Sequence, residues 1–252
     1  MYCKEEKMEQ DRTGGEKIVE LKFNRILFEE MGREFALKPL PVDPDYKLKY
    51  PDADDKSVYL KNELFACGKT GGIRMGEMNF GGSMIVHFGS VQPAKDYDFP
   101  VLGFTFACSS RFLIVVLDLH PVSKDNKYME KYIAPLKDIS RKYAWIPQAE
   151  GGRSELHDWA KIHDSGYSLY RWCDPHYVPD VEEAFREYVK VFCACIKKAE
   201  PITDPEMRLR RDTYIEKYRE DYITKDPGSA PLQHYFGEKW GERYLREFLF
   251  GA

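Results

Sequence analysis

Six polar side chains stand inside or beside apolar segments of the sequence, where they are the candidates for chemistry. Carboxyl and imidazole groups act as general acids and bases in enzymes, and a guanidinium group suits a carboxylate. Burying any of these groups is costly unless it has a partner or lines a cavity that admits water. The six candidates are Glu77, His87, Thr105, Asp118, Arg171 and Asp226.

For three of these residues the sequence leaves a purely structural role open. His87 lies in the apolar run MIVHF and could be a core histidine bonded to a backbone carbonyl. Asp226 precedes Pro227 and could cap a turn. Arg171 could form an ordinary salt bridge. The residues alone do not decide between these roles and a functional one.

Other common chemistries have no signal in the sequence. No glycine-rich phosphate loop follows a strand, because Gly71-Gly72 and Gly81-Gly82 are better explained as turns. No group of residues has metal-ligand spacing, since Cys193 and Cys195 would point in different directions on a helix. Ser-His-Asp catalysis stays open, although there is no nucleophile-elbow pattern. We therefore expect no bound metal and no nucleotide cofactor.

The elements that must position these residues follow from the hydrophobic pattern. Two β-rich apolar runs, residues 101–108 and 112–119, flank a Ser-Ser-Arg connection and predict a buried hairpin. With strands predicted at 57–65, 73–80 and 84–90, this gives an antiparallel meander of about five strands. A further strand is predicted at 167–172 after a long irregular stretch, 144–165. Helical spacing or polar helical character predicts helices at 17–37, after Pro121 to 142, 180–199, 204–223 and 231–250.

This order of elements predicts an α/β fold, a three-layer α/β/α sandwich with a central, mainly antiparallel sheet. We expect the 252-residue chain to form one domain, 16–252, after a flexible charged tail, 1–15. A net charge of −4 argues against nucleic-acid binding, and no apolar run is long enough to span a bilayer. Six scattered cysteines favour a reducing compartment. The N-terminal residues lack the apolar core of a signal peptide and are too acidic for a transit peptide, although a mature form would look the same.

Two distant blocks in the right order carry a resemblance to a known family. They are YDFPVLGFTFACSSRFLIVVLDLHP, residues 97–121, and KDPGSAPLQHYFGEKWGERYLREFLF, residues 225–250. Together they resemble the ferredoxin-dependent bilin reductases, from about Lys17 to the end of the chain. The IVVLDLHP and KDPG segments look most like phytochromobilin synthase and the phycoerythrobilin-forming members. Red chlorophyll catabolite reductase is a weaker match.

The resemblance implies an enzyme that reduces biliverdin or 15,16-dihydrobiliverdin, held between the sheet and the C-terminal helices. Electrons would come one at a time from reduced [2Fe–2S] ferredoxin and pass through substrate radicals, with no flavin, nicotinamide or metal bound. The resemblance also implies a monomer in the plastid stroma or a cyanobacterial-type cytoplasm.

Carried over by position, the resemblance gives several residues a role. Asp226 matches a C-terminal aspartate that donates protons, and His87 matches a strand histidine that takes part in proton transfer. Glu77 lies near a proton-donating glutamate of some members. Arg171 matches an arginine that holds a substrate propionate. Thr105 stands where many members have a central aspartate, so it could only hydrogen-bond the pyrrole nitrogens or a water.

Two further expectations concern partners and alternatives. Because ferredoxin is acidic, we expect a basic docking face, for which the candidates are Lys197, Lys198, Arg208, Arg210 and Arg211. The alternatives are a non-catalytic bilin carrier, which Thr105 makes conceivable, and a reductase of a chlorophyll catabolite. The sequence leaves open which double bond is reduced and whether two or four electrons are delivered.

Overall fold

The computed structural model describes residues 18–52, 54–149 and 155–251. Within these ranges eight strands form one antiparallel sheet in the order β1-β3-β4-β5-β6-β7-β8, with β2 also paired to β3. The strands are β1 (Lys38–Pro39), β2 (Leu48–Lys49), β3 (Val58–Ala66), β4 (Thr70–Phe80), β5 (Met84–Pro93), β6 (Val101–Ser109), β7 (Leu113–His120) and β8 (Leu169–Cys173). The predicted meander is confirmed as β3 to β7. The predicted tail, 1–15, lies outside the described residues.

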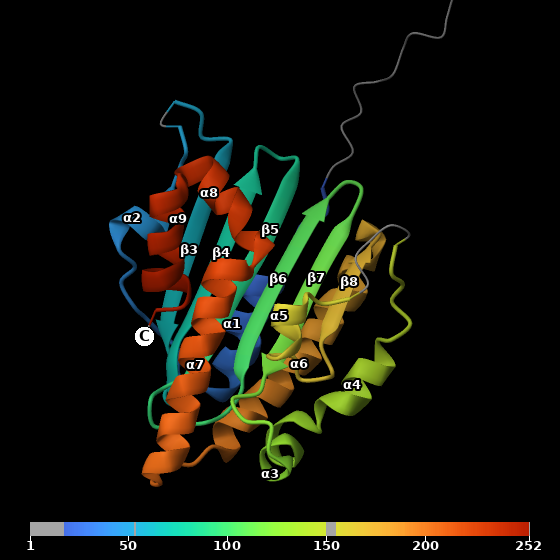
Figure 1. The fold of residues 1–252 in the computed structure, drawn as a ribbon. Coiled ribbons are helices and arrows are strands. Elements are labelled where there is room, and N and C mark those ends of the chain that lie inside the picture. Colours follow the sequence, from blue (N-terminus) through green and yellow to red (C-terminus); the bar gives the residue numbers. More distant parts are fainter. Residues whose placement is uncertain (1–17, 53, 150–154, 252) are drawn as a thin grey trace, which may run out of the picture.

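The helices lie on both sides of this sheet. They are α1 (Phe23–Glu34), α2 (Pro44–Lys47), α3 (Asn126–Tyr128), α4 (Leu136–Lys142), α5 (Asp158–Lys161), α6 (Val178–Lys198), α7 (Pro205–Lys225), α8 (Ala230–Phe236) and α9 (Glu238–Tyr244). In Figure 1, α1 and α6 lie behind the sheet, whereas α7, α8 and α9 cross its front. The α/β fold with an antiparallel sheet is therefore as predicted.

Several predicted helices are shorter or interrupted in the structure. The N-terminal helix begins at Phe23 rather than near residue 17. The C-terminal helix is split into α8 and α9 at Gly237, whose φ of 88° lies in the left-handed region that favours glycine. The helix after Pro121 contains a π-helical segment, Met129–Ile133, between α3 and α4. The stretch predicted as irregular, 144–165, contains the short helix α5.

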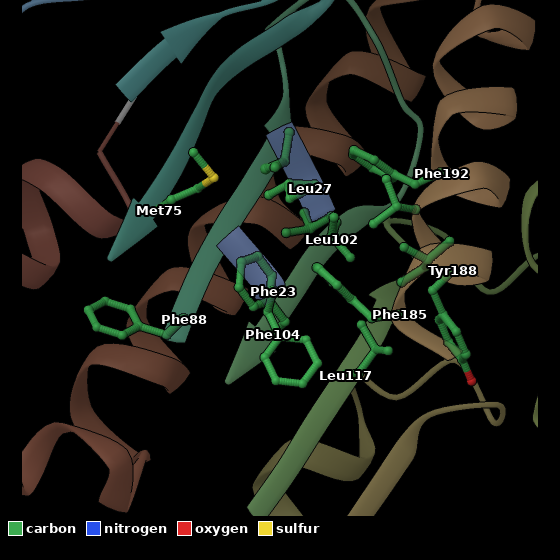
Figure 2. Close-up of a cluster of buried hydrophobic side chains, with 14 of the residues drawn as sticks. Phe23, Leu27, Met75, Phe88, Leu102, Phe104, Leu117, Phe185, Tyr188 and Phe192 are labelled. Carbon is green, nitrogen blue, oxygen red and sulfur yellow. The ribbon is translucent and has the colours of Figure 1, made fainter. Parts of the chain in front are cut away.

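The apolar core fills the space between the sheet and the layer of α1 and α6. The ring of Phe23 on α1 stacks on Phe106 of β6, with 3.6 Å between centroids and 15° between planes. Phe185 of α6 packs edge-on against Phe106 at 5.1 Å. Figure 2 shows Phe23, Phe104 and Phe185 within the same cluster. Each fully buried side chain of this kind contributes about 1.5–3 kcal/mol, so this face supplies much of the stability.

Among the described residues, none of the helices combines the length and the hydropathy that crossing a bilayer would require.

Candidate active site

A polar row crosses the other face of the sheet, beneath α7. The register pairs Arg74 with Ser90, Ser90 with Gly103, and Gly103 with Asp118. Residues paired in this way share a face of the sheet. A Cβ on Gly103 would lie 3.2 Å from the hydroxyl oxygen of Tyr218 on α7. Arg74, Ser90 and Asp118 therefore lie under α7, and glycine at 103 permits the close approach of the helix.

Asp118 is the buried carboxyl group of this row, with 2% of its surface exposed. Its oxygens accept hydrogen bonds from the backbone N–H of Ser165, at 2.8 Å, and from the hydroxyl of the same residue. Burial raises the pKa of Asp118 to about 7, and the neighbouring charge of Asp164 acts in the same direction. A substantial fraction of this carboxyl group is therefore protonated at neutral pH.

His120 connects this carboxyl group to α7. Its Nδ1 lies 3.1 Å from the carbonyl oxygen of His163 and 3.5 Å from Oδ2 of Asp118. A carbonyl oxygen only accepts, so Nδ1 carries the hydrogen and Nε2 is the acceptor. The hydroxyl of Tyr222 lies 3.4 Å from Nε2 and is placed to donate to it. Burial lowers the pKa of His120 to about 4, so the ring is neutral at pH 7.

Three tyrosines form the surface that α7 turns toward this face. Tyr214, Tyr218 and Tyr222 are four residues apart and so lie along one side of the helix. The rings of Tyr218 and Tyr222 are 4.6 Å apart, and that of Tyr218 is 5.1 Å from His120. Burial raises the pKa of Tyr218 and Tyr222 well above 10, so both stay protonated. The result is an aromatic surface with hydroxyl groups.

Asp226 begins the turn that follows α7. Its Oδ1 accepts the backbone N–H of Gly228 at 2.9 Å, so the structural role that the sequence suggested, a cap, is present. Among the described residues no hydrogen bond reaches Oδ2. The side chain is half-buried, and burial raises its pKa. One oxygen can therefore hold the turn while the other carries an exchangeable proton.

Thr105 occupies the neighbouring row on the same face. It pairs with Phe88 of β5 and with Val116 of β7. In β6 it is the next residue after Gly103 that points to this face. The ring of Phe88 covers Gly76, where a Cβ would lie 2.3 Å from it. The structure thus places Thr105 and Asp118 on the face of the sheet that carries α7, the helix that ends at Lys225, one residue before Asp226.

His87 and Glu77 lie together, but on the opposite face. They are register partners, with Nε2 of His87 3.3 Å from Oε2 of Glu77. Nδ1 of His87 accepts a long hydrogen bond, 3.4 Å, from the backbone N–H of Asn24 on α1. The hydrogen bond from His87 is the main cause that lowers the pKa of Glu77 to about 2, against the effect of burial. The pair is separated by the sheet from Thr105 and Asp118.

Arg171 also belongs to the face of α6. It pairs with Val115, which pairs with the core residue Phe106. Its Nε donates to the carbonyl of Ile146 at 2.9 Å and its Nη1 to that of Tyr170 at 2.8 Å. Within the described residues it has no carboxylate within 4.0 Å, so the expected alternative, a salt bridge, is not seen there.

Sequence reasoning missed a third buried histidine, His163. Nε2 of His163 lies 2.9 Å from Oδ2 of Asp221 on α7, and its Nδ1 lies 3.2 Å from the hydroxyl of Tyr214. Although burial raises the pKa of Asp221, hydrogen bonds from Lys225, His163 and Lys217 hold it well below its usual range. The only sequence signal was the pair of lysines four residues on either side of Asp221. This cluster ties the segment before β8 to α7.

The space left between these groups is small. A cavity of about 20 Å³ is lined by Asp118, His120, Tyr170 and Tyr222, among others. That is room for about one water molecule. In the part of the chain that is described, no three or more His, Cys, Asp or Glu side chains are grouped as metal ligands would be.

Most of the basic residues predicted for docking have partners. Lys197 pairs with Glu34, Arg208 with Asp96 at 2.6 Å, and Arg210 with Glu206 at 3.1 Å. Arg211 is buried and donates to the backbone carbonyls of residues 93, 94 and 97. Lys198 is exposed.

Carboxyl, imidazole and phenol groups gathered between the sheet and a tyrosine-lined helix give this α/β fold a site whose groups are suited to acid–base chemistry. The chain belongs to the ferredoxin-dependent bilin reductase family, whose model matches residues 25–251. It is accordingly a ferredoxin-dependent oxidoreductase of bilins, in agreement with the resemblance seen in the sequence.

Individual relatives cover most of the chain. The 15,16-dihydrobiliverdin:ferredoxin oxidoreductase of Nostoc punctiforme is 30% identical over 231 residues, which are 90% of this chain and 93% of that protein. The phycoerythrobilin:ferredoxin oxidoreductase of Gloeobacter violaceus is 23% identical over 227 residues, 86% of this chain and 89% of that protein. Phytochromobilin synthase from tomato, solved in complex with biliverdin, has the same fold, with a TM-score of 0.82 and 22% identity over 91% of this chain and 82% of that one.

Proposed function

We propose that this protein reduces a linear tetrapyrrole, biliverdin or 15,16-dihydrobiliverdin, to a phycobilin or phytobilin. The electrons come one at a time from reduced [2Fe–2S] ferredoxin, and no other cofactor is tightly bound. The names of the relatives support this substrate class. The observation that carries the proposal is that two carboxyl groups with raised pKa, Asp118 and Asp226, belong to the layer where the sheet meets α7.

The proposed chemistry saturates one double bond with two electrons and two protons. Each electron from ferredoxin gives a substrate radical of higher basicity, which then takes a proton from a general acid. Asp226 is the first donor, because its half-buried carboxyl group can regain a proton from solvent. Thr105 hydrogen-bonds the pyrrole nitrogens or a water, since a hydroxyl group cannot supply an acidic proton at neutral pH.

His87 and Glu77, which the sequence also nominated for catalysis, have a different role in this proposal. The hydrogen bond between His87 and Glu77 faces α1, and the contact between His87 and Asn24 joins that helix to the sheet. We assign the pair to holding α1 in place rather than to direct proton transfer. A His87→Gln variant that lowers stability but leaves the reduced product unchanged is the expected result.

Substrate binding requires the aromatic layer to move. Pockets for small molecules are roughly 300–1,000 Å³, far more than the cavity beside Tyr222. In the three-layer α/β/α sandwich, the bilin enters between the sheet and the layer of α7, α8 and α9, and it takes the place of tyrosine side chains there. The monomer functions in the plastid stroma or a cyanobacterial-type cytoplasm.

Mixing the protein with biliverdin and a reduced-ferredoxin system tests this function. A reductase bleaches the bilin through radical intermediates to a new pigment, which chromatography identifies together with the double bond reduced. A carrier, the alternative favoured by Thr105 and by the small cavity, shifts the absorption once and then stops. The same assay with 15,16-dihydrobiliverdin or with a red chlorophyll catabolite identifies the substrate.

A further inference from the structure

A second carboxyl group, Asp164, lies beside Asp118 and has no part in the proposed reaction. It belongs to the loop between α5 and β8, directly before Ser165, whose N–H and hydroxyl both bind Asp118. Its Oδ2 accepts the backbone N–H of Gly166 at 2.9 Å in an exposed position. Its Oδ1 is buried, and no hydrogen bond from the described residues reaches it. Such an oxygen is costly to bury, so it is suited to a small donor such as water.

The small cavity under α7 offers a place for that water. Asp118 and Asp164 both line its volume of about 20 Å³, together with the ring of Tyr222. A buried water molecule needs roughly two to four polar partners, and the two carboxyl groups supply acceptors. Because the cavity is only about one water molecule wide, a water in it lies within reach of both carboxyl groups.

Asp118 needs a connection of this kind because it is closed off from solvent. Its surface is 2% exposed, and its oxygens accept hydrogen bonds from Leu119 and Ser165. Once Asp118 has given its proton toward the bilin, it is a buried carboxylate that must be protonated again before the next reduction. Asp164 is half-buried, with one oxygen inside and the other in an exposed hydrogen bond. Of the two carboxyl groups that line the cavity, it is the one that reaches solvent.

We infer that Asp164 carries protons from solvent to Asp118 through a water molecule in this cavity, an inference that rests on the proposed function. Protonated Asp164 gives the proton on Oδ1 to the water, and the water gives one of its own protons to the carboxylate of Asp118. Asp164 then takes a proton from solvent on Oδ2, and half a turn about its Cβ–Cγ bond brings that proton to Oδ1. The sum is one proton moved from solvent to Asp118, with no electron transferred.

The other titratable groups around the two carboxyl groups are poorer proton sources. Lys124 is exposed, but its Nζ donates to the backbone carbonyl of Asp164 and it does not line the cavity. Burial lowers the pKa of His163, and that of His120 to about 4, so neither ring is an acid at pH 7. On α7, burial raises the pKa of all three tyrosines, Tyr214, Tyr218 and Tyr222.

The test separates the first reduction from those that follow it. Wild type and Asp164→Asn are mixed with excess biliverdin and reduced ferredoxin at about pH 6, where Asp118 holds its proton because burial raises its pKa to about 7. Asparagine can still accept the N–H of Gly166, but it has no acidic proton to pass on. Stopped-flow absorbance should show a first turnover at the wild-type rate and later turnovers slower by about tenfold or more.

Two further variants sharpen this test. In Asp164→Ala, added formate should restore the later turnovers, because a small acid can take the place of the missing carboxyl group. Asp158→Asn is the matched control and should behave as the wild type at both stages. Asp158 is an exposed carboxylate on α5 that pairs with Lys161 at 2.9 Å.

Each other outcome is decisive. A first turnover that slows as much as the later ones shows that Asp164 acts through its charge or through folding, and it overturns the inference. Later turnovers at the wild-type rate in Asp164→Asn, or no effect of formate on Asp164→Ala, also overturn it. All three results leave the reductase function standing, whereas a wild type that forms no reduced pigment overturns the function itself.

Discussion

The hydroxyl of Tyr222 lies 3.4 Å from Nε2 of His120 and thereby joins α7 to β7. On the other side of the imidazole ring, Nδ1 faces Asp118 and the carbonyl of His163. A protonated carboxyl group, a neutral imidazole and a phenol thus stand in sequence across the layer. A proton can pass from Asp118 toward the surface where the bilin is proposed to bind once the imidazole changes tautomer, so that Nδ1 accepts from Asp118 and Nε2–H donates to the hydroxyl oxygen of Tyr222.

Tyr222→Phe tests this sequence of groups, because it keeps the ring and removes the hydroxyl. Turnover should fall about tenfold or more, while bilin affinity changes little. The loss is smaller than the roughly 10²–10⁴-fold effect of a group that itself donates the proton, because Tyr222 acts through His120. Tyr214→Phe is the control, since its hydroxyl contacts His163 rather than His120. Single-turnover kinetics measure the effect, and equal loss in both variants would contradict the assignment.

Asp226→Asn should abolish or redirect reduction while bilin binding is retained. Asparagine caps a turn about as well as aspartate, so the turn should survive. Asp174→Asn is a close control, because Asp174 also precedes a proline and accepts a backbone N–H two residues on, at 2.9 Å. Unchanged product from Asp226→Asn, identified by chromatography, would remove this residue from the mechanism.

The pair formed by Asp118 and His120 predicts opposite pH effects on stability. In the folded protein their pKa values are about 7 and about 4, against about 3.9 and 6.5 in an unfolded chain. At intermediate pH the unfolded chain holds one proton on histidine and the folded chain holds one on aspartic acid. Both states bind one proton, so the pair adds little pH dependence to the free energy of unfolding.

Replacing either partner should expose the contribution of the other. In Asp118→Asn the depressed pKa of His120 remains. The free energy of unfolding should therefore increase with pH between about pH 4 and 6.5, more steeply than in the wild type. In His120→Gln the raised pKa of Asp118 remains. The free energy of unfolding should therefore decrease as the pH rises from about 4 to 7. Urea denaturation at several pH values measures both slopes. Curves parallel to wild type in both variants would disprove the coupling.

The stacked pair of Phe23 and Phe106 predicts where stability resides. Phe23→Ala should lower the free energy of unfolding by about 3–5 kcal/mol, because it empties a fully buried site. Phe28 lies on the same helix but is 43% exposed, so Phe28→Ala should cost less than about 1 kcal/mol. Chemical denaturation provides both values, and similar losses would contradict this location of the core.

Electron delivery should depend on ionic strength if an acidic ferredoxin docks on the basic residues near the end of α6. Pairing with neighbouring carboxylates does not remove this effect, since exposed ion pairs are weak. Lys198→Glu should reduce ferredoxin-dependent turnover several-fold at low salt and leave bilin affinity intact. Lys239→Glu, an exposed lysine on α9, is the control. Turnover that is insensitive to salt would argue against this docking face.

Most of the fold could be predicted from the sequence because its strands are long and bounded by clear turns. The runs around Phe106 and Val115 have the length and composition of buried strands, and both were placed within one or two residues. The two-residue strands β1 and β2 carry too little pattern to be seen. The break at Gly237 was missed because apolar residues continue at helical spacing on both sides of it.

The candidate site was harder to predict because both faces of the sheet are covered. Alternation shows which residues of one strand share a face, but it does not show which face, nor how neighbouring strands align. The segment between β5 and β6, residues 94–100, leaves their register undetermined in the sequence. For this reason His87 was grouped with Thr105, although the register pairs His87 with Phe106 and directs it to α1.

Strand β6 illustrates what this alternation permits. Phe104 and Phe106 belong to the core, whereas Gly103 and Thr105 belong to the layer under α7. A substitution at Thr105 can change the reaction without disturbing the packing that Phe104 and Phe106 maintain, whereas a side chain at Gly103 would collide with Nε2 of His120, 2.8 Å from its Cβ. Related chains can therefore differ in which bond they reduce and still keep the same fold. In β6, one set of alternate residues would vary with the reaction, and the other set would be kept by the core.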